Sequence, residues 1–184
     1  MKKITLVILL TISAISFAQE KNSFLDEVQK KHEVKINALS LIAFKWFDVS
    51  YEYLINKESS VGVATLISFN DDIGFDSYRT FSLTPYYRRY FSKGYAKGFF
   101  VEGFGMLNTY KNNNVYYYGS YTNDTSERFT DFAVGISAGG KFVTKNGFVA
   151  EIYLGLGRNL FNDSNSYHNI DVVGRGGISL GYRF

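Results

Sequence analysis

Apolar and polar residues alternate along most of the chain from residue 34 onward. The clearest example is the last stretch, residues 174–184, where one parity ends in Ile178, Leu180, Tyr182 and Phe184. The other parity of that stretch holds only small or charged residues. Because successive side chains of a strand point to opposite faces, this pattern predicts a terminal β-strand with one apolar face and one polar face.

Eight segments of this kind follow one another, separated by turn residues. They cover residues 34–44, 47–56, 61–69, 78–91, 99–110, 127–144, 148–158 and 174–184. Asn146-Gly147 is a strong signal for a tight hairpin between the sixth and seventh segments. Pro85 lies inside the fourth segment and lacks a ladder donor, which favours an edge or a bulge there.

The connections between these segments alternate in length. Those at 56–59, 92–98 and 145–147 are short, whereas those at 70–77, 111–126 and 159–171 are longer and polar. Outer-membrane barrels have an even number of strands, short periplasmic turns and longer external loops. The sequence therefore predicts an all-β, eight-stranded, antiparallel, up-and-down transmembrane β-barrel over residues 34–184. The first external connection, around Lys45-Trp46, is a very short exception.

The N-terminus reads as a secretory signal. Lys2 and Lys3 precede an apolar run at residues 4–15, and residues 16–18 form a small-x-small cleavage site. We expect cleavage after Ala18, followed by a short periplasmic lead at residues 19–33. No later stretch approaches the roughly 20 apolar residues of a membrane helix, so a membrane location requires a closed barrel.

The polar parity of the predicted strands collects charges of both signs. Its predicted lumen residues are Glu52, Arg88, Glu102, Asp131, Lys141, Glu151, Arg175 and Arg183. An eight-stranded barrel is only wide enough for its own side chains. Because unpaired buried charge is costly, we expect these groups to pair with one another and with tyrosine hydroxyls, forming a plug rather than a pore.

A tyrosine-rich external loop is the main candidate for a contact surface. Residues 111–126, with the preceding position, contain Tyr110, Tyr116, Tyr117, Tyr118 and Tyr121. Tyrosine supplies rigid amphipathic contact area at low entropic cost, and loops on a rigid scaffold often carry function. A surface-binding loop and a simple hairpin extension with self-packed tyrosines both fit this composition.

Catalytic and metal sites find little support in the sequence. There is no Cys, and His168 lies near Ser164, Ser166 and Asp171 in a polar loop without the spacing of a known hydrolase. No catalytic residue, metal ligand or cofactor is predicted. The formal charge of +3 falls to +1 when Lys2 and Lys3 are removed, which argues against a nucleic-acid partner.

The chain resembles small eight-stranded outer-membrane barrels of the OmpA-transmembrane-domain and OmpX type. It is more similar to an uncharacterised barrel family of the Bacteroidota, through Asp48-Val49-Ser50-Tyr51-Glu52-Tyr53 and the terminal Gly181-Tyr182-Arg183-Phe184. The resemblance implies a bacterial outer-membrane location, contact with lipid and lipopolysaccharide, and assembly through the barrel-assembly machinery. In that setting Ile178, Leu180, Tyr182 and Phe184 form the barrel-assembly signal.

Three functions remain open from the sequence. The first is a structural or cell-surface interaction barrel without enzymatic activity. The second is an enzyme that modifies lipid A. The third is a soluble lipocalin-like barrel that holds an apolar ligand, which requires the apolar parity to face inward.

Overall fold

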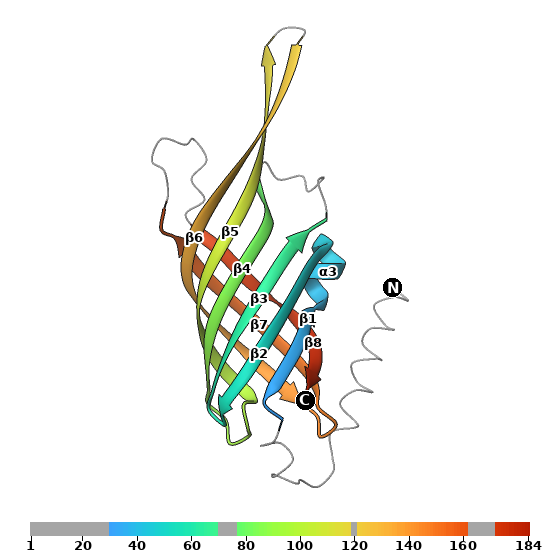
Figure 1. The fold of residues 1–184 in the computed structure, drawn as a ribbon, viewed down its shortest axis with the longest axis vertical. Coiled ribbons are helices and arrows are strands. Elements are labelled where there is room, and N and C mark those ends of the chain that lie inside the picture. The colour runs from blue at the N-terminus through green and yellow to red at the C-terminus, as the bar shows by residue number, and fades with distance from the viewer. Residues whose placement is uncertain (1–29, 70–76, 119–120, 162–171) are drawn as a thin grey trace, which may run out of the picture.

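The computed structural model describes residues 30–69, 77–118, 121–161 and 172–184. Its strands form a closed antiparallel barrel in which each strand pairs with its sequence neighbours and β1 pairs with β8 (Figure 1). The strands are β1 (His32–Asn37), β2 (Trp46–Asn56), β3 (Ser59–Ser68), β4 (Ser77–Tyr90), β5 (Gly98–Tyr118), β6 (Tyr121–Val143), β7 (Phe148–Asn159) and β8 (Val172–Arg183). The predicted all-β, eight-stranded antiparallel barrel is confirmed.

Side-chain parity divides the barrel wall into an apolar outside and a charged inside. On β8, Ile178, Leu180 and Tyr182 are 44–50% exposed, whereas Ser179 and Arg183 are buried. Every strand shows exposed large apolar side chains of this kind on its outer face. This arrangement contradicts the lipocalin-like alternative, because that alternative needs the apolar face inside.

The predicted first strand, residues 34–44, is wrong beyond Asn37. The chain turns there into the short helix α3 (Ala38–Phe44), which begins where the Asn37 side chain accepts a hydrogen bond from the Ser40 N–H. Lys45 ends the helix in the left-handed conformation, with φ of 55°. The apparently short first connection is therefore a helical one. Among the described residues no helix is long and apolar enough to cross a membrane.

The predicted loop at residues 111–126 is also wrong, since its backbone continues β5 and β6. The two strands pair from Gly98 opposite Lys141 to Tyr118 opposite Tyr121. Pairing of β5 with β4 ends at Asn112, and pairing of β6 with β7 ends at Ala133. The remainder is a two-stranded ribbon that projects from the barrel (Figure 1). We call this the hairpin end, and we call the opposite end, with the short connections and Phe184, the turn end.

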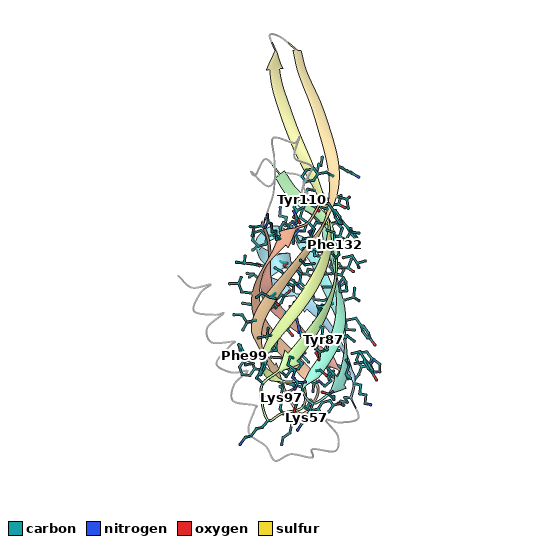
Figure 2. All side chains as sticks on the ribbon, turned by 90° about the vertical axis from the view of Figure 1, so that its left-hand side faces the viewer. Lys57, Tyr87, Lys97, Phe99, Tyr110 and Phe132 are labelled. Atoms are coloured by element: carbon teal, nitrogen blue, oxygen red, sulfur yellow. The ribbon has the colours of Figure 1, made fainter. Side chains whose placement is uncertain are left out.

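Aromatic side chains gather on the outer face near both ends. Near the turn end the exposed ones include Tyr87, Phe99, Phe142, Phe148, Tyr182 and Phe184. Figure 2 shows Tyr87 and Phe99 close to the turn end. Phe44 and Phe69 are exposed near the hairpin end. Trp46 lies on the inward parity of β2, so it does not belong to this outer band.

Pro85 lies in the middle of β4, although the sequence favoured an edge or a bulge at this position. It pairs in register with Val63 of β3. On the other side, the β4–β5 ladder keeps one register from Leu83 to Tyr86 but skips Thr84 and Pro85. The bulge of β4 lies elsewhere, between Arg79 and Phe81. A missing N–H is thus accommodated by a local gap in one ladder.

Candidate functional site

Nine buried charged side chains fill the lumen from the turn end to its middle. These residues, which we call the lumen plug, are Glu33, Lys35, Glu52, Arg88, Glu102, Lys141, Glu151, Arg175 and Arg183. None is more than 8% exposed. They come from every strand except β3, which contributes the buried hydroxyl of Ser60. The plug is therefore a product of barrel closure rather than of any local motif.

Glu52 is the centre of the plug. Its Oε2 accepts from Lys35 Nζ at 2.5 Å and from Arg88 Nη1 at 3.0 Å. Its Oε1 accepts from Lys141 Nζ at 2.7 Å, and also from the hydroxyls of Ser60 and Tyr90. Its Oε2 also accepts from the hydroxyl of Tyr86 at 3.4 Å. One carboxylate thus meets three cations and three hydroxyls, which satisfies both of its oxygens in the buried interior.

Arg88 joins three carboxylates across the barrel. Its Nη1 and Nη2 bind Glu151 at 2.7 and 2.8 Å, and its Nε binds Glu102 at 2.6 Å. The guanidinium also lies over the rings of Tyr86 and Phe100, at 4.6 and 4.3 Å from their centres. Arginine suits this position because its planar fork donates in several directions while its faces stack on aromatic rings.

The plug continues through Glu102 and ends at Arg175. Glu102 Oε1 accepts from Arg175 Nη1 and from Ser137 Oγ, both at 2.8 Å. Arg175 in turn lies over the rings of Tyr86, Phe104 and Tyr153. This layer forms the upper limit of the plug, on the side of the hairpin end.

The turn end is closed by the connection between β4 and β5. Arg183 donates from Nη1 to the carbonyl of Tyr95 at 2.9 Å and from Nη2 to that of Ala96 at 2.8 Å. Its Nε binds Glu33 at 2.7 Å. Tyr95 and Ala96 are buried in one apolar cluster with Leu54, Tyr90, Phe100 and Tyr153. The turn thus folds across the mouth of the barrel and is held there by the penultimate residue of the chain.

The structure brings seven of the eight predicted lumen residues into the plug, and Asp131 lies apart from them. Asp131 Oδ1 accepts the backbone N–H groups of Phe132 and Phe161, at 2.6 and 3.1 Å. Glu33 and Lys35 are not among the predicted lumen residues, because Glu33 falls in the predicted periplasmic lead at residues 19–33 and Lys35 at the start of the first predicted strand. The alternation Glu33-Val34-Lys35-Ile36 was a usable signal, since both charges share a parity.

The predicted tyrosine contact surface is only partly described. Tyr110 is 4% exposed, and its ring stacks on Phe129 with the ring centres 5.3 Å apart. It therefore lies inside the lumen and cannot be an external contact residue. Tyr116, Tyr117, Tyr118 and Tyr121 belong to the projecting β5–β6 hairpin, and their side chains lie outside the described part of the structure.

A small cavity lies in the lumen between the plug and the hairpin end. It has a volume of about 60 Å³, and the polar side chains that line it include Trp46, Asp48, Arg79, Ser82, Thr84 and Arg175. We call it the hairpin-end cavity. Ser164, Ser166, His168 and Asp171, which the sequence offered as a weak catalytic group, lie outside the described residues. In the described ranges, no three His, Cys, Asp or Glu residues are grouped as metal ligands.

The four residues of the predicted barrel-assembly signal lie at the end of the chain, beside the β1–β8 seam. Ile178, Leu180, Tyr182 and Phe184 are all exposed on the outer face. Phe184 exchanges two backbone hydrogen bonds with His32, at 3.0 and 2.8 Å, which extends the β1–β8 seam to the last residue. The His32 and Phe184 rings also stack, with their centres 5.8 Å apart.

Comparison with known proteins gives a family and a similar fold. The model of the family "Protein of unknown function (DUF3575)" matches residues 4–177. The crystal structure of the N-terminal beta-barrel domain of Pseudomonas aeruginosa OprF superimposes with a TM-score of 0.54 at 14% sequence identity. That match covers 84% of this chain and 98% of the OprF domain. No curated protein is significantly similar in sequence. The shared fold is an eight-stranded barrel.

Proposed function

The chain belongs to the DUF3575 family, whose function is unknown, and from that premise we propose that it is an integral barrel of the bacterial outer membrane. Its lumen is closed by ion pairs, and its projecting hairpin serves as a contact surface at the cell exterior. The hairpin end then faces the medium and the turn end faces the periplasm. The resident partners are lipid and lipopolysaccharide around the wall and the barrel-assembly machinery during biogenesis.

The apolar outer face of the barrel is the observation that carries this proposal. On β7, Phe148, Ile152, Leu154 and Leu156 are 45–75% exposed, and the neighbouring strands show the same outer face. Phe148 to Leu156 spans about 27 Å along the strand at ~3.4 Å per residue, or about 20 Å along the axis at a tilt of ~40°. That height is close to the roughly 25 Å apolar band of outer-membrane barrels. Large exposed apolar patches are rare on soluble monomers, so lipid is the environment that this surface fits.

The projecting hairpin supports a role at the exterior. Its strands continue past the last barrel pairs, Ser77 with Asn112 and Ala133 with Asn159, so the ribbon is rigidly rooted in the wall. A filled lumen offers no ligand space comparable to that of a channel. The projecting ribbon, whose sequence contains four tyrosines, is therefore the part of the molecule best placed to meet another surface.

The location is tested by cell fractionation and gel migration of the full-length protein and of a variant that lacks Phe184. We expect outer-membrane recovery and a heat-modifiable band for the natural chain, and impaired folding for the variant because the β1–β8 seam loses its last hydrogen bonds. A soluble protein that is indifferent to loss of Phe184 contradicts the proposal. Lipid A mass spectra with and without the protein test the alternative enzymatic function in the same strains.

The contact surface is tested by a deletion that respects strand register. Residues 113–126 are replaced by Asn-Gly, because Asn113 lies opposite Ser126 and a two-residue turn can then connect the pair Asn112–Glu127. A matched variant keeps the hairpin and replaces Tyr116, Tyr117, Tyr118 and Tyr121 with Ser. We expect both variants to fold and to lose binding of whole cells to immobilised glycans or matrix proteins. Binding that survives in both variants refutes the role of the hairpin.

A further inference from the structure

We propose that the hairpin-end cavity binds a small monovalent oxyanion of the carboxylate class. The cavity measures about 60 Å³. A water molecule needs roughly 10–15 Å³ of such space, so the cavity has room for about four waters or for one anion of acetate size. It lies above the Arg175 layer of the plug, and it is a separate compartment from the ion pairs around Glu52.

The unmet hydrogen-bonding atoms on the cavity wall are donors. Nε1 of Trp46 and Nε of Arg79 are buried and have no hydrogen-bond partner among the described residues. An indole nitrogen and a guanidinium can only donate. Leaving a buried donor without a partner is unfavourable, so the occupant that suits this wall is an acceptor.

Charge on the wall favours an anion with a single negative charge. Arg79 donates to the carbonyl of Gly174 at 3.3 Å and lies over the Tyr110 ring at 5.9 Å, but it forms no salt bridge with any described residue. Arg175, by contrast, is already paired with Glu102. The carboxylate on this wall, Asp48, accepts from Asn37 at 2.9 Å. An anion beside Arg79 gives it the direct salt bridge that Asp48, which attracts it from across the wall, does not form, while Asp48 repels a dianion such as phosphate more strongly than a monoanion.

Trp46 makes the test site-specific, because it is the single tryptophan of the chain. The folded full-length protein in detergent is titrated with sodium acetate at constant ionic strength. Sodium HEPES keeps the ionic strength constant, because the HEPES anion is too large for the cavity. Trp46 is excited at a wavelength at which tyrosine does not absorb, and its fluorescence emission is recorded. We expect a saturable change in Trp46 emission with acetate and a weaker change with phosphate. Acetamide, which has the same shape as acetate without the charge, should cause no change.

Variants separate the cavity from general salt effects. Arg79→Gln should weaken the apparent acetate affinity by about tenfold or more, since a charge-assisted pair is lost. Arg158→Gln is the matched control, because Arg158 is exposed on the outer face of β7, and it should leave the titration unchanged. A change that is equally strong with acetamide, or equally strong in Arg79→Gln, overturns the site.

A second measurement on the natural chain does not depend on how the variants fold. Iodide should quench Trp46 emission more strongly than neutral acrylamide, and acetate should compete with iodide. Quenching by acrylamide alone, with no acetate competition, also overturns the proposal.

Discussion

Removing the charge of Glu52 should destabilise the barrel by about the value of one broken buried ion pair. Glu52→Gln keeps the shape of the side chain but leaves Lys35, Arg88 and Lys141 without their shared partner. Each of these cations retains another carboxylate, since Glu151 binds both Lys35 and Arg88 and Glu33 binds Lys141. The loss is therefore about 3–5 kcal/mol, the usual cost of removing one partner of a buried pair, rather than three times that amount.

The assay is urea unfolding of the folded barrel in lipid vesicles, followed by the heat-modifiable band on a gel. The matched control is Glu58→Gln, which removes the same charge from an exposed pair with Arg89 at 2.7 Å. The two side chains of that pair are 40% and 51% exposed, so its loss should cost less than about 1 kcal/mol. Glu52→Gln should thus lower the unfolding free energy several times more than Glu58→Gln.

Equal effects of the two substitutions would refute this reasoning. They would mean that water enters the lumen and screens Glu52 as it screens Glu58. A loss near 10 kcal/mol for Glu52→Gln would refute it in the other direction, because it would show that Glu33 and Glu151 do not compensate the remaining cations.

Three further changes test other parts of the structure in the same unfolding assay or by proteolysis. Gly139→Ala should lower stability, because the added Cβ would collide with the carbonyl oxygen of Ile152. Gly140→Ala is the control and should be nearly neutral, because a Cβ there has nothing within 4 Å; equal unfolding midpoints for the two variants would contradict the packing. Asn37→Ala should lower the unfolding free energy by about 1–2 kcal/mol, because it removes the helix cap and the hydrogen bond to Asp48. Asn37→Ser should recover part of that loss, and equal stability of the two variants would argue against the cap. Arg183→Met should release the β4–β5 turn and speed tryptic cleavage after Lys93 or Lys97. Arg89→Met is the control and should leave the cleavage rate unchanged; an unchanged rate in Arg183→Met would show that Arg183 does not hold the turn.

Side-chain alternation is the reason that the strands and the inside-outside assignment could be predicted. The terminal strand shows this directly, because its apolar parity is exposed and Arg183 is buried. The predicted strand is wrong at residues 38–44, because Ala38-Leu39-Ser40-Leu41-Ile42-Ala43-Phe44 is a short apolar run, which periodicity alone does not assign to helix or strand. The helix cap distinguishes the two, because the Asn37 side chain accepts a hydrogen bond from the Ser40 N–H at the start of α3.

The predicted loop at residues 111–126 is wrong for a related reason. Residues 111–126 carry no apolar alternation and resemble a polar loop, although their backbone continues the β5–β6 ladder. The partners within the plug depend on register as well as on parity. Arg88 meets Glu151 across 63 residues only because strands β4 to β7 are aligned by their ladders. The sequence shows which charges face inward, but not which of them meet.

The position of Arg183 has a consequence for the order in which the barrel can become stable. Glu33 belongs to the first strand and Arg183 to the last, 150 residues later. Glu102 of β5 binds both Arg88 and Arg175, and Arg175 also lies on β8. A chain that lacks β8 would keep both carboxylates but lose two of their cations, and the turn across the mouth would be unfastened. Glu33 would then be left with Lys141 and Glu102 with Arg88, so the plug completes its ion pairs only when β8 is in place. Long-range pairing of this kind is slow to form, so we expect the contacts of β8 to be the last that the plug acquires.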